Sequence, residues 1–120
     1  MPTTVLIVDD HAPFRVLVGR LLGAAGFDVV GEAPDGLTAL AVSAVLRPDL
    51  ILLDVQLPDI DGFEVVRRLR AQGAASRVVL TSSRDAADYA DAVAASTTAG
   101  FIPKAELSGS ALSELLRDCR

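Results

Sequence analysis

The chain has 120 residues, of which 51% are hydrophobic but only 4% aromatic, and 16 acidic against 11 basic side chains give a net charge of −5. This length suits one domain with a core of its own, so we expect a single domain over residues 1–120. The acidic balance argues against direct binding to nucleic acid or to an anionic membrane surface, because both require clustered Lys and Arg.

The cysteine content and the N-terminal sequence indicate where the protein works. Cys119 is the single cysteine, so no intrachain disulfide can form, which is typical of a reducing cytoplasm. No window approaches 18 uncharged apolar residues, and the start MPTTVLIVDD lacks the basic region and cleavage site of a secretion signal. We therefore expect a cytoplasmic protein without a membrane segment.

The first predicted elements are a strand and a helix. The run Thr4–Val8 is apolar and rich in β-branched residues, which is typical of a buried strand. From Phe14 to Leu22 the apolar residues recur with helical spacing. Pro13 suits the first turn of this helix, and Gly26 suits the turn that follows it.

The same alternation continues through the second and third strands. Asp28–Glu32 predicts a strand, and the residues from Leu37 to Val45 repeat the helical spacing. Pro48 is expected to end this second helix. Leu50–Leu53 is continuously apolar, as expected of a strand covered on both faces.

The third helix is predicted by its start signal. Asp61, with Glu64 three residues later, resembles a capping box that opens a helix running through Leu69. The next strand is predicted over Arg77–Thr81.

The last part of the chain predicts a fourth helix, a fifth strand over Gly100–Pro103 and a fifth helix over Ser110–Leu116. The helical segment Asp85–Ala99 consists mostly of Ala, with Tyr89 and Val93 as its large apolar residues. It should bury less area than the first helix and shift more easily. An Ala-rich helix of good propensity is the alternative interpretation.

Strands that alternate with helices predict a parallel sheet, because parallel neighbours need a long crossover connection. We expect an α/β fold with a doubly wound five-stranded parallel sheet of order 2-1-3-4-5, in a flavodoxin-like three-layer sandwich. In this order the crevice for ligands lies at the carboxyl ends of the strands, between the first and third strands.

The residues at those strand ends carry chemistry: they are Asp9, Asp10, Asp54, Thr81, Ser82 and Lys104. Carboxylates about 5 Å apart repel by roughly 3 kcal/mol per pair at an effective dielectric of about 20, so a cation is expected among them. An oxygen-only cluster with room for water suits Mg²⁺, and Lys104 and Thr81 suit a phosphoryl group. Singly, either Asp9 or Asp10 would more simply cap the helix near Pro13.

The sequence resembles the response-regulator receiver domains of two-component signalling, the superfamily of CheY-like proteins. The resemblance rests on VLIVDD, PDLILLDVQLPDIDGFEV, VVLTS and AGFIPK, and it extends over essentially the whole chain. It implies that Asp54 accepts a phosphoryl group and that Asp10 and Asp9 help to hold Mg²⁺ or Mn²⁺, together with Asp54 and the backbone carbonyl of Gln56.

The resemblance also implies the remaining roles. Lys104 would contact Asp54 and the phosphoryl oxygens, Thr81 would follow the phosphoryl group, and Phe101 would be the switch aromatic. The implied partner is a sensor histidine kinase or a phosphotransfer protein, and a homodimer would use the face of the fourth helix, fifth strand and fifth helix. Any output domain would lie outside these 120 residues.

Two alternatives belong to other functional classes. A receiver-like scaffold would bind a partner without phosphorylation, but such a protein would be expected to lack one of the five residues Asp9, Asp10, Asp54, Thr81 and Lys104, and all are present. A small Mg²⁺-dependent phosphatase would normally carry a cap insertion for which 120 residues leave no room.

Overall fold

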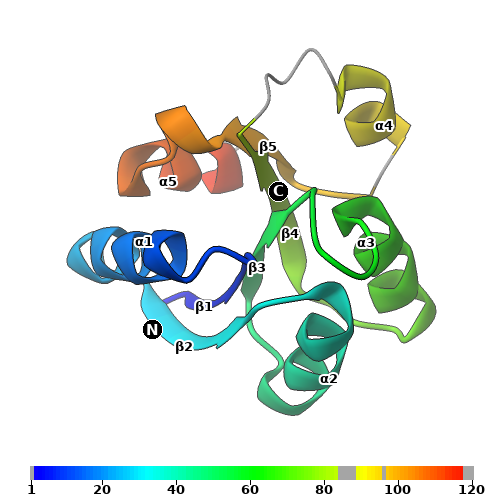
Figure 1. Ribbon diagram of the computed structural model, residues 1–120. Helices are drawn as coiled ribbons and strands as arrows, with labels where there is room; N and C mark the ends of the chain where they lie inside the picture. Colours follow the sequence, from blue (N-terminus) through cyan, green and yellow to red (C-terminus); the bar gives the residue numbers. More distant parts are fainter. Residues whose placement is uncertain (1, 84–88, 96, 118–120) are drawn as a thin grey trace.

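The computed structural model describes residues 2–83, 89–95 and 97–117, and Cys119 lies outside them. Five parallel strands form one sheet in the order β2-β1-β3-β4-β5, which confirms the predicted topology. Helices α1 and α5 cover one face of this sheet, and α2, α3 and α4 cover the other (Figure 1). The fold is therefore the expected three-layer α/β sandwich.

The strands are β1 Thr4–Val8, β2 Asp28–Ala33, β3 Leu50–Asp54, β4 Arg77–Ser82 and β5 Gly100–Pro103. Three of them run one residue beyond the predicted bounds, because pairing continues there: Val8 pairs with Ala33, Asp54 with Thr81, and Ser82 with Pro103. The carboxyl ends of β1, β3 and β4 thus reach the positions of the candidate site.

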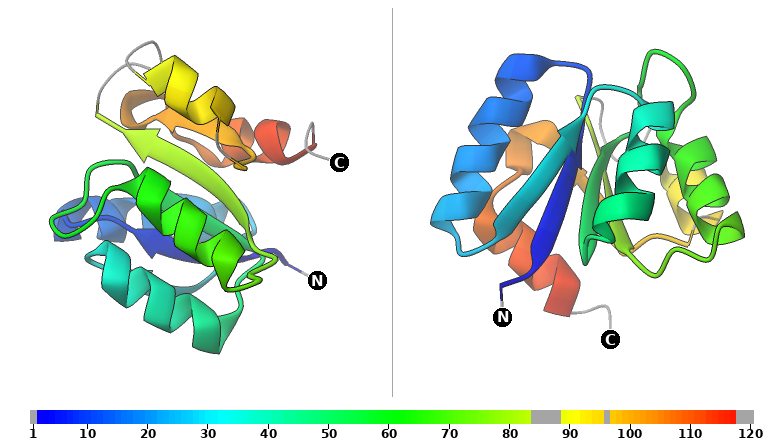
Figure 2. Two further views of the ribbon diagram at one scale, coloured as in Figure 1. Left: turned by 90° about the vertical axis from the view of Figure 1, so that its right-hand side faces the viewer. Right: turned by 90° about the horizontal axis from the view of Figure 1, so that it is seen from below.

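The helices are α1 Ala12–Ala24, α2 Gly36–Leu46, α3 Gly62–Ala71, α4 Ala90–Ala95 and α5 Gly109–Arg117, with a short 3₁₀ helix, η2, over Lys104–Glu106. Pro13 lies in the first turn of α1, and Gly26 follows that helix with a φ of 95°. Arg47 adopts a left-handed conformation with a φ of 46° and ends α2 directly before Pro48, as the sequence predicts. Figure 2 shows α5 running beside α1 on their shared face of the sheet.

The core consists of two clusters, one on each face of the sheet. Leu6, Val8, Ile51 and Leu53 pack toward α2 and α3, whereas the alternating residues Val5, Ile7, Leu50 and Leu52 pack toward α1 and α5. All eight are essentially inaccessible to solvent, with exposures of at most 1%. The continuous apolar runs are thus the consequence of burial on both faces.

The start of α3 confirms half of the predicted capping box. The Asp61 carboxylate accepts a hydrogen bond from the Glu64 backbone N–H at 2.8 Å. The Glu64 carboxylate, however, contacts Arg67 at 2.7 Å and Arg68 at 2.9 Å on the exposed side of the helix. Two guanidinium groups one turn away on the same helix provide stronger partners than a single backbone N–H.

Helix α4 ends before the carboxyl end of the predicted segment Asp85–Ala99. It covers Ala90–Ala95 and has no buried residue, while Tyr89 and Val93 are half-buried. Residues 97–99 are not helical, and residues 85–88 and 96 lie outside the described part of the chain. The weak burial expected of this segment is confirmed, whereas its mobility stays a prediction.

Within the described ranges, no helix is long and apolar enough to cross a membrane.

Candidate functional site

The carboxyl ends of three strands bring Asp9, Asp10, Asp54 and Lys104 to one edge of the sheet. Asp9 and Asp10 follow β1, Asp54 ends β3, and Lys104 follows β5. Carboxylate oxygens of Asp9, Asp10 and Asp54 lie within 4.8 Å of one another. The adjacent Asp9 and Asp10 and the distant Asp54 therefore form one acidic cluster.

Lys104 lies within this cluster and pairs with two of its carboxylates. Its Nζ is 2.7 Å from Oδ2 of Asp9 and 3.0 Å from Oδ2 of Asp54. The ammonium also lies 4.5 Å from the centre of the Phe14 ring, close enough for a cation–π contact. Burial alone would lower the pKa of Lys104, but the neighbouring carboxylates outweigh burial and raise the pKa above its usual value.

The Asp54 carboxylate is held at both oxygens. Its Oδ1 accepts a hydrogen bond from the Gln56 backbone N–H at 3.0 Å, and its Oδ2 accepts one from Lys104. Burial raises the pKa of Asp54; the Gln56 N–H and Lys104 oppose this rise, and the charge of Asp9 adds to it. The net effect is a raised pKa, so the ionised carboxylate is less stable here than in water.

Hydrogen bonds hold both the side chain and the backbone carbonyl of Asp9. Its side chain is 1% exposed, and Oδ1 accepts a hydrogen bond from the His11 backbone N–H at 2.8 Å. Arg15 donates to the Asp9 carbonyl oxygen at 2.6 Å and to Glu32 on β2 at 2.9 Å. His11 begins α1 without a side-chain cap, so neither neighbouring aspartate serves as the cap of this helix.

Gly62 allows α3 to begin directly beside the loop after β3. A Cβ at this position would lie 2.7 Å from the carbonyl oxygen of Asp54 and 2.9 Å from Cα of Val55. The Gly62 N–H donates to the Val55 carbonyl at 2.8 Å. A larger residue would displace the backbone that carries Asp54.

The composition of the cluster fits a divalent cation. Three carboxylates surround one ammonium, and Asp10 is exposed, with no ion pair among the described residues. Its donors are oxygens only, which suits Mg²⁺ or Mn²⁺ better than softer metals. Gln56 lies two residues after Asp54 and donates its backbone N–H to the Asp54 carboxylate. The Gln56 carbonyl therefore belongs to the loop that directly follows Asp54.

Residues 5–117 match the family described as the response regulator receiver domain. The chain belongs to this family. Its sequence therefore represents the receiver domain of a response regulator in a two-component system.

Other proteins are similar to this receiver domain over most of its length. A Pseudomonas aeruginosa protein named as a candidate transcriptional regulator is 40% identical over 112 residues, 93% of this chain and 52% of that protein. A protein-glutamate methylesterase/protein-glutamine glutaminase of Myxococcus xanthus is 42% identical over 102 residues, 84% of this chain and 29% of that protein. The chain thus spans about half or less of these relatives.

A solved structure supports the fold. The signal receiver domain of the response regulator NarL from Mycobacterium tuberculosis has a TM-score of 0.84 and 34% identity, covering 98% of this chain and 95% of that one. The strand order and the layers of this receiver domain thus agree with a structure of similar sequence.

Phe101 of the receiver domain is one of three aromatic rings in a row. Its ring centre lies 5.9 Å from that of Tyr89, which in turn lies 6.1 Å from that of Phe63 on α3. The resemblance implies that Phe101 is the switch aromatic, and the fold joins it to α3 through Tyr89. A movement of Phe101 would therefore change the packing of Tyr89, because each ring packs on the next.

Thr81 has a buried hydroxyl next to Asp54. The two residues are paired across β3 and β4, and Thr81 is 1% exposed. Its Oγ1 has no hydrogen-bond partner among the described residues. A buried hydroxyl without a hydrogen-bond partner lowers the stability of the fold. The Thr81 hydroxyl is therefore a donor that a ligand at this edge can use.

Sequence reasoning missed Phe14 and Arg15 as site residues. Phe14 was assigned only to the apolar stripe of α1, and Arg15 was given no role. The available signal is their position in the first turn of the helix that follows Asp9 and Asp10, because this turn begins beside the cluster.

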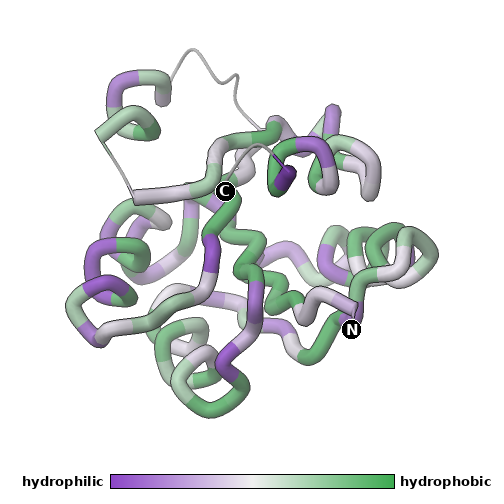
Figure 3. The backbone as a smooth tube through the Cα atoms, turned by 180° about the vertical axis from the view of Figure 1, so that it is seen from behind, coloured by the Kyte–Doolittle hydropathy of each residue, from purple (hydrophilic) through white to green (hydrophobic). Residues whose placement is uncertain are grey.

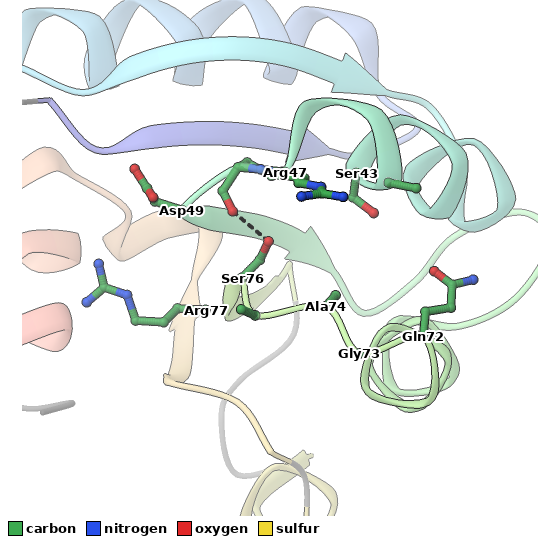
Figure 4. A pocket seen from close by; sticks show the side chains of 11 residues that line it. Ser43, Arg47, Asp49, Gln72, Gly73, Ala74, Ser76 and Arg77 are labelled. Atoms are coloured by element: carbon green, nitrogen blue, oxygen red, sulfur yellow. Dashed lines mark hydrogen bonds between the residues drawn. The ribbon is translucent and has the colours of Figure 1, made fainter.

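One marked hollow of the described structure does not contain the site. It has a volume of about 770 Å³ and is lined by Ser43, Arg47, Asp49, Gly73 and Arg77, among others (Figure 4). Asp49 and Arg77 lie at the amino ends of β3 and β4, so this hollow is at the opposite edge of the sheet from Asp54. The acidic cluster lies instead at the carboxyl edge, where Asp9 and Asp54 are buried and Asp10 is exposed.

Proposed function

We propose that this receiver domain accepts a phosphoryl group on Asp54 and transmits the change through β5 and its neighbouring helices. The observation that supports the proposal most directly is the pairing of the Asp54 carboxylate with Lys104 beside two further carboxylates. A buried carboxylate held this way is oriented and lies next to a charge that can receive a phosphoryl oxygen.

The proposed step is an in-line displacement at phosphorus. A carboxylate oxygen of Asp54 forms a bond to the phosphorus of a phosphohistidine, while the bond between phosphorus and the imidazole nitrogen breaks. The electron pair of that bond returns to the imidazole of the kinase or phosphotransfer protein. The product is an aspartyl phosphate, which water later hydrolyses at the same site.

The side chains around Asp54 assist through position and charge. Lys104 carries an ammonium whose raised pKa keeps it charged at neutral pH, so it neutralises phosphoryl oxygens. The Gln56 N–H fixes one oxygen of Asp54 and thereby the direction of the other.

Asp9, Asp10, Asp54 and the Gln56 carbonyl would hold a Mg²⁺ or Mn²⁺ ion in this proposal. When bound, the cation neutralises charge on the transferred phosphoryl group and lowers the cost of the ionised carboxylates. The His11 N–H and the Gln56 N–H orient the carboxylates of Asp9 and Asp54 for this role.

The proposed output begins at Thr81. Its unpaired hydroxyl would donate to a new phosphoryl oxygen, and the space that it leaves would admit Phe101, which pairs with Leu80 on the adjacent strand. Because α4 has no buried residue, a change at Phe101 and Tyr89 would shift this helix at small cost.

The partners and the location complete the proposal. A sensor histidine kinase or phosphotransfer protein would supply the phosphoryl group in the cytoplasm, and the α4–β5–α5 face would form a homodimer after phosphorylation. The similar proteins are named for transcription regulation and for methylesterase activity, so the output could be either class.

The test is phosphorylation with acetyl phosphate and Mg²⁺, followed by intact-protein mass spectrometry. The parent should gain the mass of one phosphoryl group, and Asp54→Asn should gain none. Asp61→Asn is the matched control, because it removes a carboxylate from the same loop while Asn still caps α3. A parent that gains no more than Asp54→Asn would refute phospho-acceptance and favour the scaffold alternative.

A further inference from the structure

Helix α2 is apolar on its outer face as well as on its inner face. Gly36–Leu46 contains no charged residue, and Figure 3 shows the helix mostly in the hydrophobic colours. The inner side buries Ala39 and Leu40, whereas Leu37 is 53% exposed and Val45 is 81% exposed. A helix that is apolar all round is normally covered on all sides, so this outer face is suited to contact another surface.

The two ends of this outer face carry opposite charges. Asp35 precedes the helix, and the carboxylate of Asp59 also binds there, accepting hydrogen bonds from Gly36 and Leu37. Arg47 follows the helix, is exposed, and has no ion pair among residues 2–83, 89–95 and 97–117. The surface is therefore negative at its beginning, apolar in the middle and positive at its end.

We propose that α2 is a self-association surface, on which two copies of this chain pack their α2 helices antiparallel about a two-fold axis at Ala41. Leu37 and Val45 each lie four residues from Ala41, and Asp35 and Arg47 each lie six residues from it. An antiparallel pair centred there places Leu37 against Val45 of the second copy, and it places the Asp35 end of each helix beside the Arg47 end of the other, twice over.

A second copy fits this face better than an unrelated helix does. Both signs of charge are present at symmetric distances, so the face is complementary to itself, as a two-fold interface requires. Ala41 and Ala44 are small and exposed, which permits close approach of two helices at the axis. The few large side chains involved make the contact small, so we expect weak, reversible association.

This surface is separate from the proposed phosphorylation output. Helix α2 packs on β2 and α3, and β2 and β5 are the two opposite edge strands of the sheet. Self-association through α2 therefore leaves Asp54 and the α4–β5–α5 face free, and it does not depend on the proposed function.

Sedimentation velocity over a range of concentrations tests the association in the unphosphorylated protein. The parent should shift toward the dimer as its concentration rises, and Val45→Asp should weaken dimerisation at least tenfold. Leu17→Asp is the matched control, because Leu17 is 54% exposed on α1, across the sheet from α2. A parent that is monomeric up to about 1 mM, or Val45→Asp dimerising like the parent, overturns the proposal.

Cysteine cross-linking in a Cys119→Ser background tests the register. Ala41→Cys should form a disulfide between the two copies, because a residue on the two-fold axis lies within disulfide reach of the same residue in the second copy. Leu37→Cys and Val45→Cys should cross-link when mixed but not separately. Efficient linkage of Leu37→Cys to itself would indicate parallel packing and contradict the proposal, as would linkage no better than that of Val16→Cys on α1.

Discussion

The two sides of the acidic cluster differ in how firmly they are built. On one side, β1 and β3 are buried on both faces, and α3 buries Gly62, Val65, Val66 and Leu69. On the other side, β5 has one buried residue and α4 has none. The carboxylates thus belong to the firm side, whereas Phe101 and Tyr89 belong to the loosely packed side.

This difference has a physical use in a phosphorylation switch. The carboxylates must keep their geometry, because small displacements weaken a charge-based site. The responding elements must instead have two packings of similar free energy, which requires little buried area. A deeply packed α4 would not respond to a change as small as one hydroxyl moving.

The largest expected effect is on the free energy of unfolding, when a valine is replaced by alanine on each of the two sides. Val66→Ala on α3 should lower the free energy of unfolding by about 2 kcal/mol, since Val66 is 2% exposed and its methyl groups leave a cavity. Val93→Ala on α4 should cost less than about 1 kcal/mol, since Val93 is only half-buried. Urea denaturation measures both. Equal costs would contradict the comparison.

Arg70 links the two sides and should have the next effect. Its guanidinium donates to the carbonyls of Ala74, Ser76 and Thr97 and to the Thr97 hydroxyl. Arg70→Met should cost about 1 to 2 kcal/mol and speed exchange of the Ala99 amide, because the chain before β5 loses its anchor on α3.

Hydrogen exchange of Ala99 gives the clearest measurement of this link. Arg67→Met is the control, because Arg67 is an exposed residue of the same helix that pairs with Glu64. Exchange that rises equally in both variants would show that Arg70 has no special role at this junction.

Asp54→Asn should stabilise the metal-free protein at pH 7. Burial places the pKa of Asp54 above its unfolded value, so folding favours the protonated form. The ionised carboxylate therefore costs stability above that raised pKa, and this cost disappears as the pH falls below about 4. Urea denaturation in EDTA between pH 4 and pH 8 should show the gain growing with pH. A gain that is independent of pH would contradict this origin.

Tyr89→Phe should have the smallest effect. The Tyr89 hydroxyl is buried without a hydrogen-bond partner among the described residues, so its removal should leave stability unchanged or raise it by at most about 1 kcal/mol. The ring contacts with Phe63 and Phe101 persist in this variant. A marked loss of stability in thermal unfolding would show that the hydroxyl has a partner in solution.

Prediction from sequence succeeded where local rules and burial agree. The strand runs around Leu52 and Val79 are continuously apolar because helices cover both faces, and this pattern needs no knowledge of the partners. The prediction was weaker at Glu64, because a backbone N–H and two arginines compete for its carboxylate. In the structure it pairs with Arg67 and Arg68. It was wrong in extending the fourth helix to Ala99, where the Thr97 carbonyl is bound by Arg70.

The sequence by itself determined the parallel α/β architecture, the strand order and the identity of the residues at the strand ends. Periodicity and turn residues are local properties that indicate alternating strands and helices. The crossover rule gives the hand of their connections, and the doubly wound fold that five strands fit, which the resemblance to receiver domains supports, gives the strand order. Only the tertiary structure decided that Phe14 lies under Lys104, that Arg70 fastens the segment before β5 to α3, and that the outer face of α2 stays uncovered. These depend on distances between elements far apart in the chain, which no local pattern encodes.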